Sequence, residues 1–244
     1  MSRLTTIFFD VGGTLIHPDL TRLMAPLLRH VQPTPAQLTR AERAAKRNQR
    51  RDGQEVPSRR PEDLGAHAGP VNWGYWQLYF TALLDELGCG YDLLPELIAR
   101  AGDSSHWSLT DPEAVPTLMR LQNDYRLAVI SNADGHIDRV LERAGLSGFF
   151  QKVIDSGLAG YEKPDPRIFR AALEVMAAQP EQSLYVGDIY AIDARGASLA
   201  GMSSLLLDPN GVYDGWDVAR IAALSELPQW LSGQWSVASR DEHS

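Results

Sequence analysis

Five short runs of apolar residues are spaced along the chain, and several of them end in a polar or acidic residue. They are TTIFFD (5–10), RLAVISNA (126–133), KVIDSG (152–157), SLYVGD (183–188) and SSLLLD (203–208). Runs this short, without a clear polar face, are typical of strands buried on both sides in a parallel sheet. They therefore predict the strands of one sheet.

Helical patterns separate these runs. Apolar residues recur at helical spacing in 111–125, 134–146 and 165–178, and each segment opens with an acidic residue, as helix caps favour. Strands alternating with such helices predict an α/β fold, with a Rossmann-like, doubly wound parallel sheet. In sheets of this kind, ligands bind at the carboxyl ends of the strands.

Residues 18–107 interrupt this alternation because their patterns are helical rather than strand-like. We therefore expect a core formed by residues 1–17 and 108–244, with an α-helical cap domain, 18–107, inserted after the first strand. Glycines and prolines in 53–70 predict a loop inside the insertion. The polar tail 236–244 is expected to be frayed.

One helix of the insertion is rich in aromatic and leucine residues at helical spacing: Trp73, Trp76, Tyr79, Phe80, Leu83, Leu84 and Leu87. Packing in the core of the insertion is favoured for them over a surface that stacks on substrate. The charged run RAERAAKRNQRR (40–51) predicts a solvated helix face, with attraction of an anionic substrate as the second interpretation.

Composition narrows the classes of partner. The chain has 244 residues, 44% of them hydrophobic, and a formal net charge of −8, which argues against nucleic-acid and membrane partners. Cys89 is the only cysteine, so the sequence has no intrachain disulfide and no cysteine-based zinc cluster. No signal-like or membrane-spanning run is present, and we expect a cytoplasmic monomer or homodimer.

Reactive side chains follow the predicted strands. Asp10 ends the first strand, where a carboxylate can act as a nucleophile and form a covalent intermediate. Ser131 and the backbone N–H of Asn132 follow the second strand, and Lys163 supplies a positive charge, as phosphoryl transfer requires. Asp188, together with Asp193 five residues later, offers the oxygen ligands that Mg²⁺ prefers. The alternative to these catalytic roles is a purely structural one, in which the aspartates stabilise turns or cap helices and Lys163 is an exposed loop lysine.

Four motifs in this order, DVGGT (10–14), SN (131–132), YEKPDPRIF (161–169) and VGDIYAIDARGASLAGM (186–202), resemble the haloacid dehalogenase superfamily of hydrolases with a first-type (C1) cap. The resemblance implies a Mg²⁺-dependent phosphatase that acts on a small phosphorylated metabolite through an aspartyl-phosphate at Asp10.

The resemblance also implies roles for single residues. Mg²⁺ would lie between Asp10, Asp188 and the backbone carbonyl of Gly12, and Asp193 would support these ligands without binding the ion directly, or act through a water molecule. Ser131 and Lys163 would hold the transferred group. Because both acids of the last motif are present, metal-assisted phosphoryl transfer is favoured over dehalogenation.

Gly12 departs from the family's pattern, in which phosphatases carry a second aspartate that protonates the leaving oxygen. Glycine cannot transfer a proton, so either a histidine substitutes for it (His17, His67 or His106) or the substrate has a good leaving group, such as an acyl or aryl phosphate. Phosphonatases also lack this aspartate and use a cap lysine, but the lysine available here, Lys46, is expected on the solvated helix face. A pseudoenzyme that keeps the phosphate and metal site for sensing is a further alternative.

Overall fold

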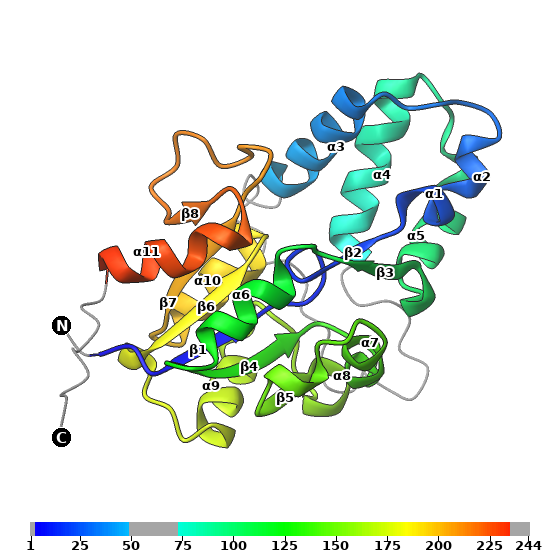
Figure 1. The fold of residues 1–244 in the computed structure, drawn as a ribbon. Coiled ribbons are helices and arrows are strands. Elements are labelled where there is room, and N and C mark those ends of the chain that lie inside the picture. The colour runs from blue at the N-terminus through cyan, green and yellow to red at the C-terminus, as the bar shows by residue number, and fades with distance from the viewer. Residues whose placement is uncertain (1–2, 49–72, 235–244) are drawn as a thin grey trace, which may run out of the picture.

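The computed structural model describes residues 3–48 and 73–234. Its centre is a six-stranded parallel sheet in the order β5-β4-β1-β6-β7-β8 (Figure 1). The strands are β1 (Thr6–Phe9), β4 (Arg126–Ser131), β5 (Lys152–Asp155), β6 (Ser183–Gly187), β7 (Ser203–Leu207) and β8 (Arg220–Ile221). The predicted fold class is confirmed, and each of the five apolar runs contains a strand. The two-residue edge strand β8 was not predicted.

Helices cover both faces of the sheet. Residues of α6 (Ala114–Leu121), α7 (Ile137–Arg143) and α11 (Leu227–Gln234) share one hydrophobic cluster with alternate strand residues such as Ile7 and Phe9. Phe8 points to the other face, where it joins α9 (Pro166–Val175) and α10 (Arg195–Leu199). This period-2 alternation, with both sides apolar, explains why the strands show no polar face in the sequence.

The helical segment lies beyond the carboxyl ends of the strands (Figure 1). It contains α1 (Leu20–Leu23), α2 (Ala25–Leu28), α3 (Pro35–Asn48), α4 (Trp73–Leu87) and α5 (Leu94–Ala101). Two short antiparallel strands, β2 (Ile16–Pro18) and β3 (Trp107–Thr110), connect it to the rest of the chain.

The helical segment has a hydrophobic core of its own. Five of the aromatic and leucine residues predicted to pack inside the insertion are buried there: Trp76, Tyr79, Phe80, Leu83 and Leu84. The predicted loop 53–70, His67, the side chain of Trp73 and the tail 236–244 lie outside the described residues.

The remaining elements are short. They are the helix α8 (Ser156–Ala159), the single turns Tyr91–Leu93, Ser104–His106, Ser147–Phe149, Pro180–Gln182 and Leu224–Glu226, and a wider turn at Tyr190–Ala194. Within residues 3–48 and 73–234, no helix combines the length and the apolar character that crossing a bilayer requires.

The strand order fixes where a ligand can enter. The chain runs outward from β1 to β4 and β5, and then returns to β6 on the other side of β1. Connections on the two sides of β1 therefore diverge at its carboxyl end, which opens a crevice there. Asp10 is the first residue after β1.

Candidate active site

Asp10 lies at the floor of a cavity of about 510 Å³. Its backbone N–H donates to the carbonyl of Val186 in β6 at 2.8 Å, which fixes the residue directly beyond the central strand. Its side chain is only 9% exposed. Residues of the strand ends and of the helical segment line this cavity together, so the carboxylate faces a space bounded by both.

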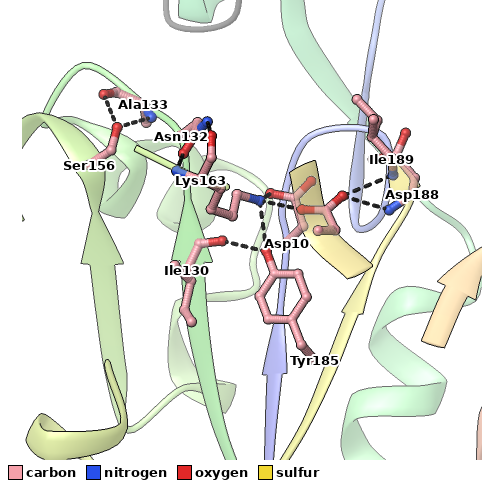
Figure 2. Close-up of polar contacts among 10 residues, drawn as sticks. Asp10, Ile130, Asn132, Ala133, Ser156, Lys163, Tyr185, Asp188 and Ile189 are labelled. Carbon is pink, nitrogen blue, oxygen red and sulfur yellow. Dashed lines mark hydrogen bonds and ion pairs between the residues drawn. The ribbon is translucent and has the colours of Figure 1, made fainter. Parts of the chain in front are cut away.

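Lys163 is the cation that binds Asp10. Its Nζ donates to Asp10 Oδ1 at 2.7 Å, to Asp193 Oδ1 at 2.8 Å and to the hydroxyl of Tyr185 at 2.7 Å. Figure 2 shows the ammonium between Asp10 and Tyr185. The three acceptors use all three protons of the ammonium group, so its position is fixed relative to Asp10.

Neighbouring residues hold the loop that carries Lys163 (Figure 2). The backbone N–H of Lys163 donates to Asn132 Oδ1 at 2.7 Å, and Asn132 Nδ2 donates to the carbonyl of Lys163 at 3.0 Å. Asn132 is thus brought beside Lys163, and Ser131 lines the same cavity. The Tyr185 hydroxyl, which the sequence analysis missed, donates to the Ile130 carbonyl at 2.9 Å and so ties Lys163 to β4.

Asp193 has both carboxylate oxygens occupied. Oδ1 accepts from Lys163, and Oδ2 accepts from the backbone N–H groups of Asp188 and Ile189 at 3.1 and 2.9 Å. A Cβ atom at Gly187 would lie 2.5 Å from this carboxyl group, so glycine is required for the close approach. The position is consistent with the predicted supporting role for Asp193.

Asp188 differs from Asp193 because one of its oxygens has no partner. Its side chain is buried, and Oδ1 makes no hydrogen bond with any described residue. Oxygens of Asp10, Asp188 and Asp193 all lie within 4.8 Å of one another. A buried carboxylate oxygen without a donor is costly, and a cation would remove that cost.

The electrostatics of the cluster point the same way. Burial raises the pKa of Asp10 to about 7, although Lys163 offsets part of the rise. Burial also raises the pKa of Asp188, against the opposing effect of Lys46. Burial alone would lower the pKa of Lys163, but the carboxylates of Asp10 and Asp193 raise it above its usual value. Three carboxyl groups, those of Asp10, Asp188 and Asp193, thus lie against the two ammonium groups of Lys163 and Lys46, and this donor set fits a hard divalent ion such as Mg²⁺.

Gly12 lies against the six-membered ring of the Trp107 indole. A Cβ atom at position 12 would meet Cζ3 of Trp107 at 2.9 Å and Cη2 at 3.2 Å. The ring is held in place because its Nε1 donates to the carbonyl of Ala101 at 2.9 Å. The space beside Asp10 in which a second acidic side chain would begin is therefore filled, a feature that the sequence analysis did not detect.

The histidines proposed as substitute acids differ in position. His17 lines the cavity, and its Nε2 lies 3.1 Å from Asp111 Oδ2, so a carboxylate orients its ring. His106 is buried beside Arg100, whose Nη2 lies 3.1 Å from His106 Nε2, and it is not among the residues that line the cavity. His17 is therefore the histidine that the described structure brings to the site.

Lys46 contradicts the prediction of a solvated helix face. Its side chain is 4% exposed, and Nζ lies 2.8 Å from Glu42 Oε1 and 3.0 Å from Asp188 Oδ2. Burial alone would lower its pKa, but Asp188 and Glu42 raise it well above the usual value, so the ammonium is charged. The expected solvation was wrong because α3 turns this face inward. The Glu-Lys spacing of four residues was the available signal.

The fold and the site define a doubly wound α/β protein with a buried aspartate–lysine pair and clustered carboxylates at the switch point of its sheet. Residues 4–201 match the family model described as haloacid dehalogenase-like hydrolase. Since this match covers most of the chain, the protein belongs to the haloacid dehalogenase-like hydrolase family.

Curated relatives match parts of the chain. It is 43% identical over 82 residues to the haloacid dehalogenase-like hydrolase domain-containing protein 3 of Bos taurus. The aligned region covers 34% of this chain and 33% of that protein. It is 41% identical over 130 residues to the glyceraldehyde 3-phosphate phosphatase of Methanothermobacter thermautotrophicus. That alignment covers 49% of this chain and 58% of that enzyme. The chain thus spans between a third and about three fifths of these relatives.

Solved structures share the fold over nearly the whole chain. The HAD-hydrolase YfnB from Bacillus subtilis, bound to magnesium, superposes with a TM-score of 0.62 and 22% sequence identity. The likeness covers 94% of this chain and 99% of that one. At this identity it shows a common fold.

Proposed function

We propose that the protein is a Mg²⁺-dependent phosphatase that acts on a small phosphorylated molecule through an aspartyl-phosphate at Asp10. The observation that carries the proposal is the carboxylate of Asp10, fixed by Lys163 at 2.7 Å beside the partnerless Oδ1 of Asp188. The phosphatase named among the relatives, and the magnesium bound by the YfnB structure, support the same assignment.

The metal site that we propose uses Asp10, Asp188 and the backbone carbonyl of Gly12. When bound, Mg²⁺ would neutralise charge on the phosphoryl group and thereby favour attack by an anion. Asp193 supports the site because its own oxygens are used by Lys163 and by the backbone of Asp188.

The chain's own residues would act in two steps. One oxygen of Asp10 attacks phosphorus, the bond from phosphorus to the leaving oxygen breaks, and the leaving group takes the electron pair. During this transfer Ser131 holds one phosphoryl oxygen, and Lys163 holds another by exchanging one of its three present acceptors for it. Water then attacks the aspartyl-phosphate and releases inorganic phosphate. His17, oriented by Asp111, is the side chain that we propose accepts the proton of that water.

The substrate class follows from Gly12 and the walls of the cavity. With no acid at position 12, substrates whose leaving group departs as a stable anion are favoured, and aryl and acyl phosphates meet this condition. The aromatic residues Tyr75, Trp76, Tyr79 and Trp107 line the cavity and would accommodate an apolar leaving group. We also propose that the helical segment, residues 18–107, acts as the cap. A cytoplasmic location and a monomeric or homodimeric state stay predictions.

The test is phosphate release from para-nitrophenyl phosphate and acetyl phosphate, measured with Mg²⁺ and with a chelator. We expect release that the chelator abolishes and that Asp10→Asn removes, while Asp138→Asn on the exposed surface of α7 retains it. Mass spectrometry after acid quenching should find the phosphoryl group on the peptide that contains Asp10. Full activity of Asp10→Asn would refute the proposal. Bound phosphate without any covalent adduct would instead favour the sensing pseudoenzyme.

A further inference from the structure

Helix α3 brings a charged pair into the cavity. Glu42 and Lys46 lie one turn apart on α3, and both line the same cavity as Asp10. Lys46 Nζ bridges Glu42 Oε1 at 2.8 Å and Asp188 Oδ2 at 3.0 Å. Its ammonium therefore stands between the helical segment and the core.

Further contacts fix α3 over the loop that follows β7. Glu42 Oε2 accepts from Asn210 Nδ2 at 2.7 Å, and Arg43 Nη2 donates to the carbonyl of Asn210 at 3.1 Å. Arg47 Nε donates to the carbonyl of Val212 at 2.5 Å. Because neighbouring residues on both sides of Lys46 contact this loop, the direction in which Lys46 enters the cavity is set by the packing of the helix.

The direction of attack determines what Lys46 faces. Phosphoryl transfer proceeds with the attacking and leaving oxygens roughly in line. Asp10 attacks from the end of β1, so the leaving oxygen departs away from the sheet, toward the helical segment. Lys163 lies on the attacking side, bonded to Asp10, Asp193 and Tyr185. Among the described residues that line the cavity, Lys46 is the only lysine or arginine that the helical segment contributes.

We propose that Lys46 is a catalytic residue that contacts the leaving oxygen and stabilises its developing negative charge, with Glu42 as its positioning residue. This inference rests on the proposed function. As the bond from phosphorus to the leaving oxygen breaks, the oxygen takes the electron pair, and the ammonium exchanges Asp188 for that oxygen while it keeps its contact with Glu42. No proton is transferred. A charge from the cap thus replaces the acid that Gly12 cannot provide.

The test measures kcat/KM for aryl phosphates whose phenols have increasing pKa, from para-nitrophenyl to phenyl to para-methylphenyl phosphate. Lys46→Met should lose little on para-nitrophenyl phosphate and about 10²-fold on para-methylphenyl phosphate, the size of effect known for one lost oxyanion donor. The plot of log kcat/KM against phenol pKa then becomes steeper. Lys46→Arg, which retains the charge, should restore most of the wild-type slope.

Arg43→Met is the matched control, because Arg43 lies on the same helix and contacts the same loop but does not line the cavity. It should leave the slope unchanged. An equal loss on all substrates, or no loss, in Lys46→Met would overturn the proposal, since cap closure or phosphate binding affects every substrate alike. If Lys46→Met does not fold, Glu42→Gln must steepen the slope in the same direction.

The two proposals fail separately. If wild type releases no phosphate, or if Asp10→Asn is fully active, the proposed function itself is wrong. If phosphate release depends on Asp10 while the slope is the same with and without Lys46, only the role of Lys46 is refuted.

Discussion

Adding a side chain at Gly12 should be costly because of Trp107. A Cβ atom at this position would lie 2.9 Å from Cζ3 of the indole, which is inside the normal contact distance. The backbone of Gly12 is not in the left-handed region, so the ring is the obstacle. Overpacking of this kind costs about 1–3 kcal/mol. For a protein of this size, each kcal/mol lowers Tm by about 2–4 °C.

Thermal unfolding of Gly12→Ala measures this steric cost without adding charge. Gly74→Ala is the matched control, because a Cβ atom there would meet no atom of the described residues within 4 Å. That change should leave Tm unchanged or raise it. In a Trp107→Leu background, the cost of Gly12→Ala should disappear, giving a coupling of about 1–3 kcal/mol between the two positions. A Gly12→Ala variant as stable as wild type would refute the steric argument.

The steric block at position 12 also determines the kinetics of Gly12→Asp. Alone, the new carboxyl group cannot reach its working position while Trp107 is in place, so hydrolysis of alkyl phosphates should not improve. Combined with Trp107→Leu, it should raise kcat/KM for alkyl phosphates above that of Trp107→Leu alone, toward the roughly 10²–10⁴-fold effect of a general acid. Faster hydrolysis of alkyl phosphates by Gly12→Asp alone would contradict the steric block by Trp107.

Three further outcomes are expected. Lys163→Met should abolish phosphate release and lower the free energy of unfolding in urea by about 3–5 kcal/mol, because buried carboxylates lose their counter-ion; unchanged stability would contradict this. Tyr185→Phe should cost about 1–3 kcal/mol in the same assay by removing a buried hydroxyl, with a smaller loss of activity than Lys163→Met. Mg²⁺ at a hundredfold excess over its Kd should stabilise the protein by about 2.7 kcal/mol, and Asp188→Asn should remove the accompanying rise in Tm; an equal rise in both proteins would place the ion elsewhere.

Much of the core could be predicted because its determinants are local in the sequence. The buried strands are apolar on both faces, and their lengths and flanking helices fix a doubly wound sheet. Asp10, Ser131 and Asp188 could be placed together because the carboxyl ends of parallel strands meet at one edge. β8 could not be predicted because it has only two residues, Arg220 and Ile221, which are too few to show the alternation of a strand.

What could not be predicted depends on contacts between segments far apart in the chain. Trp107 contacts Gly12 although the two are 95 positions apart in the sequence, and the residues next to either of them do not indicate this contact. Tyr185 sits inside a strand, where an aromatic residue is ordinary, yet its hydroxyl bonds to Lys163. Lys46 stands in a run of charges that favours solvation, and only the packing of α3 against the core turns it inward.

Two of these three unforeseen residues, Trp107 and Lys46, bear on the same chemical problem. Trp107 fills the space into which a side chain at position 12 would extend, and Lys46 brings a charge into the same cavity. An ammonium that stabilises a leaving anion keeps its proton, so the substrates that it serves are those whose leaving group can depart as an anion, and among them its benefit grows with the pKa of that leaving group. Aryl and acyl phosphates are such substrates. A core without an acid at position 12 and a helical segment that supplies a lysine are therefore complementary. We expect the effects of substitutions at Gly12, Trp107 and Lys46 to be non-additive.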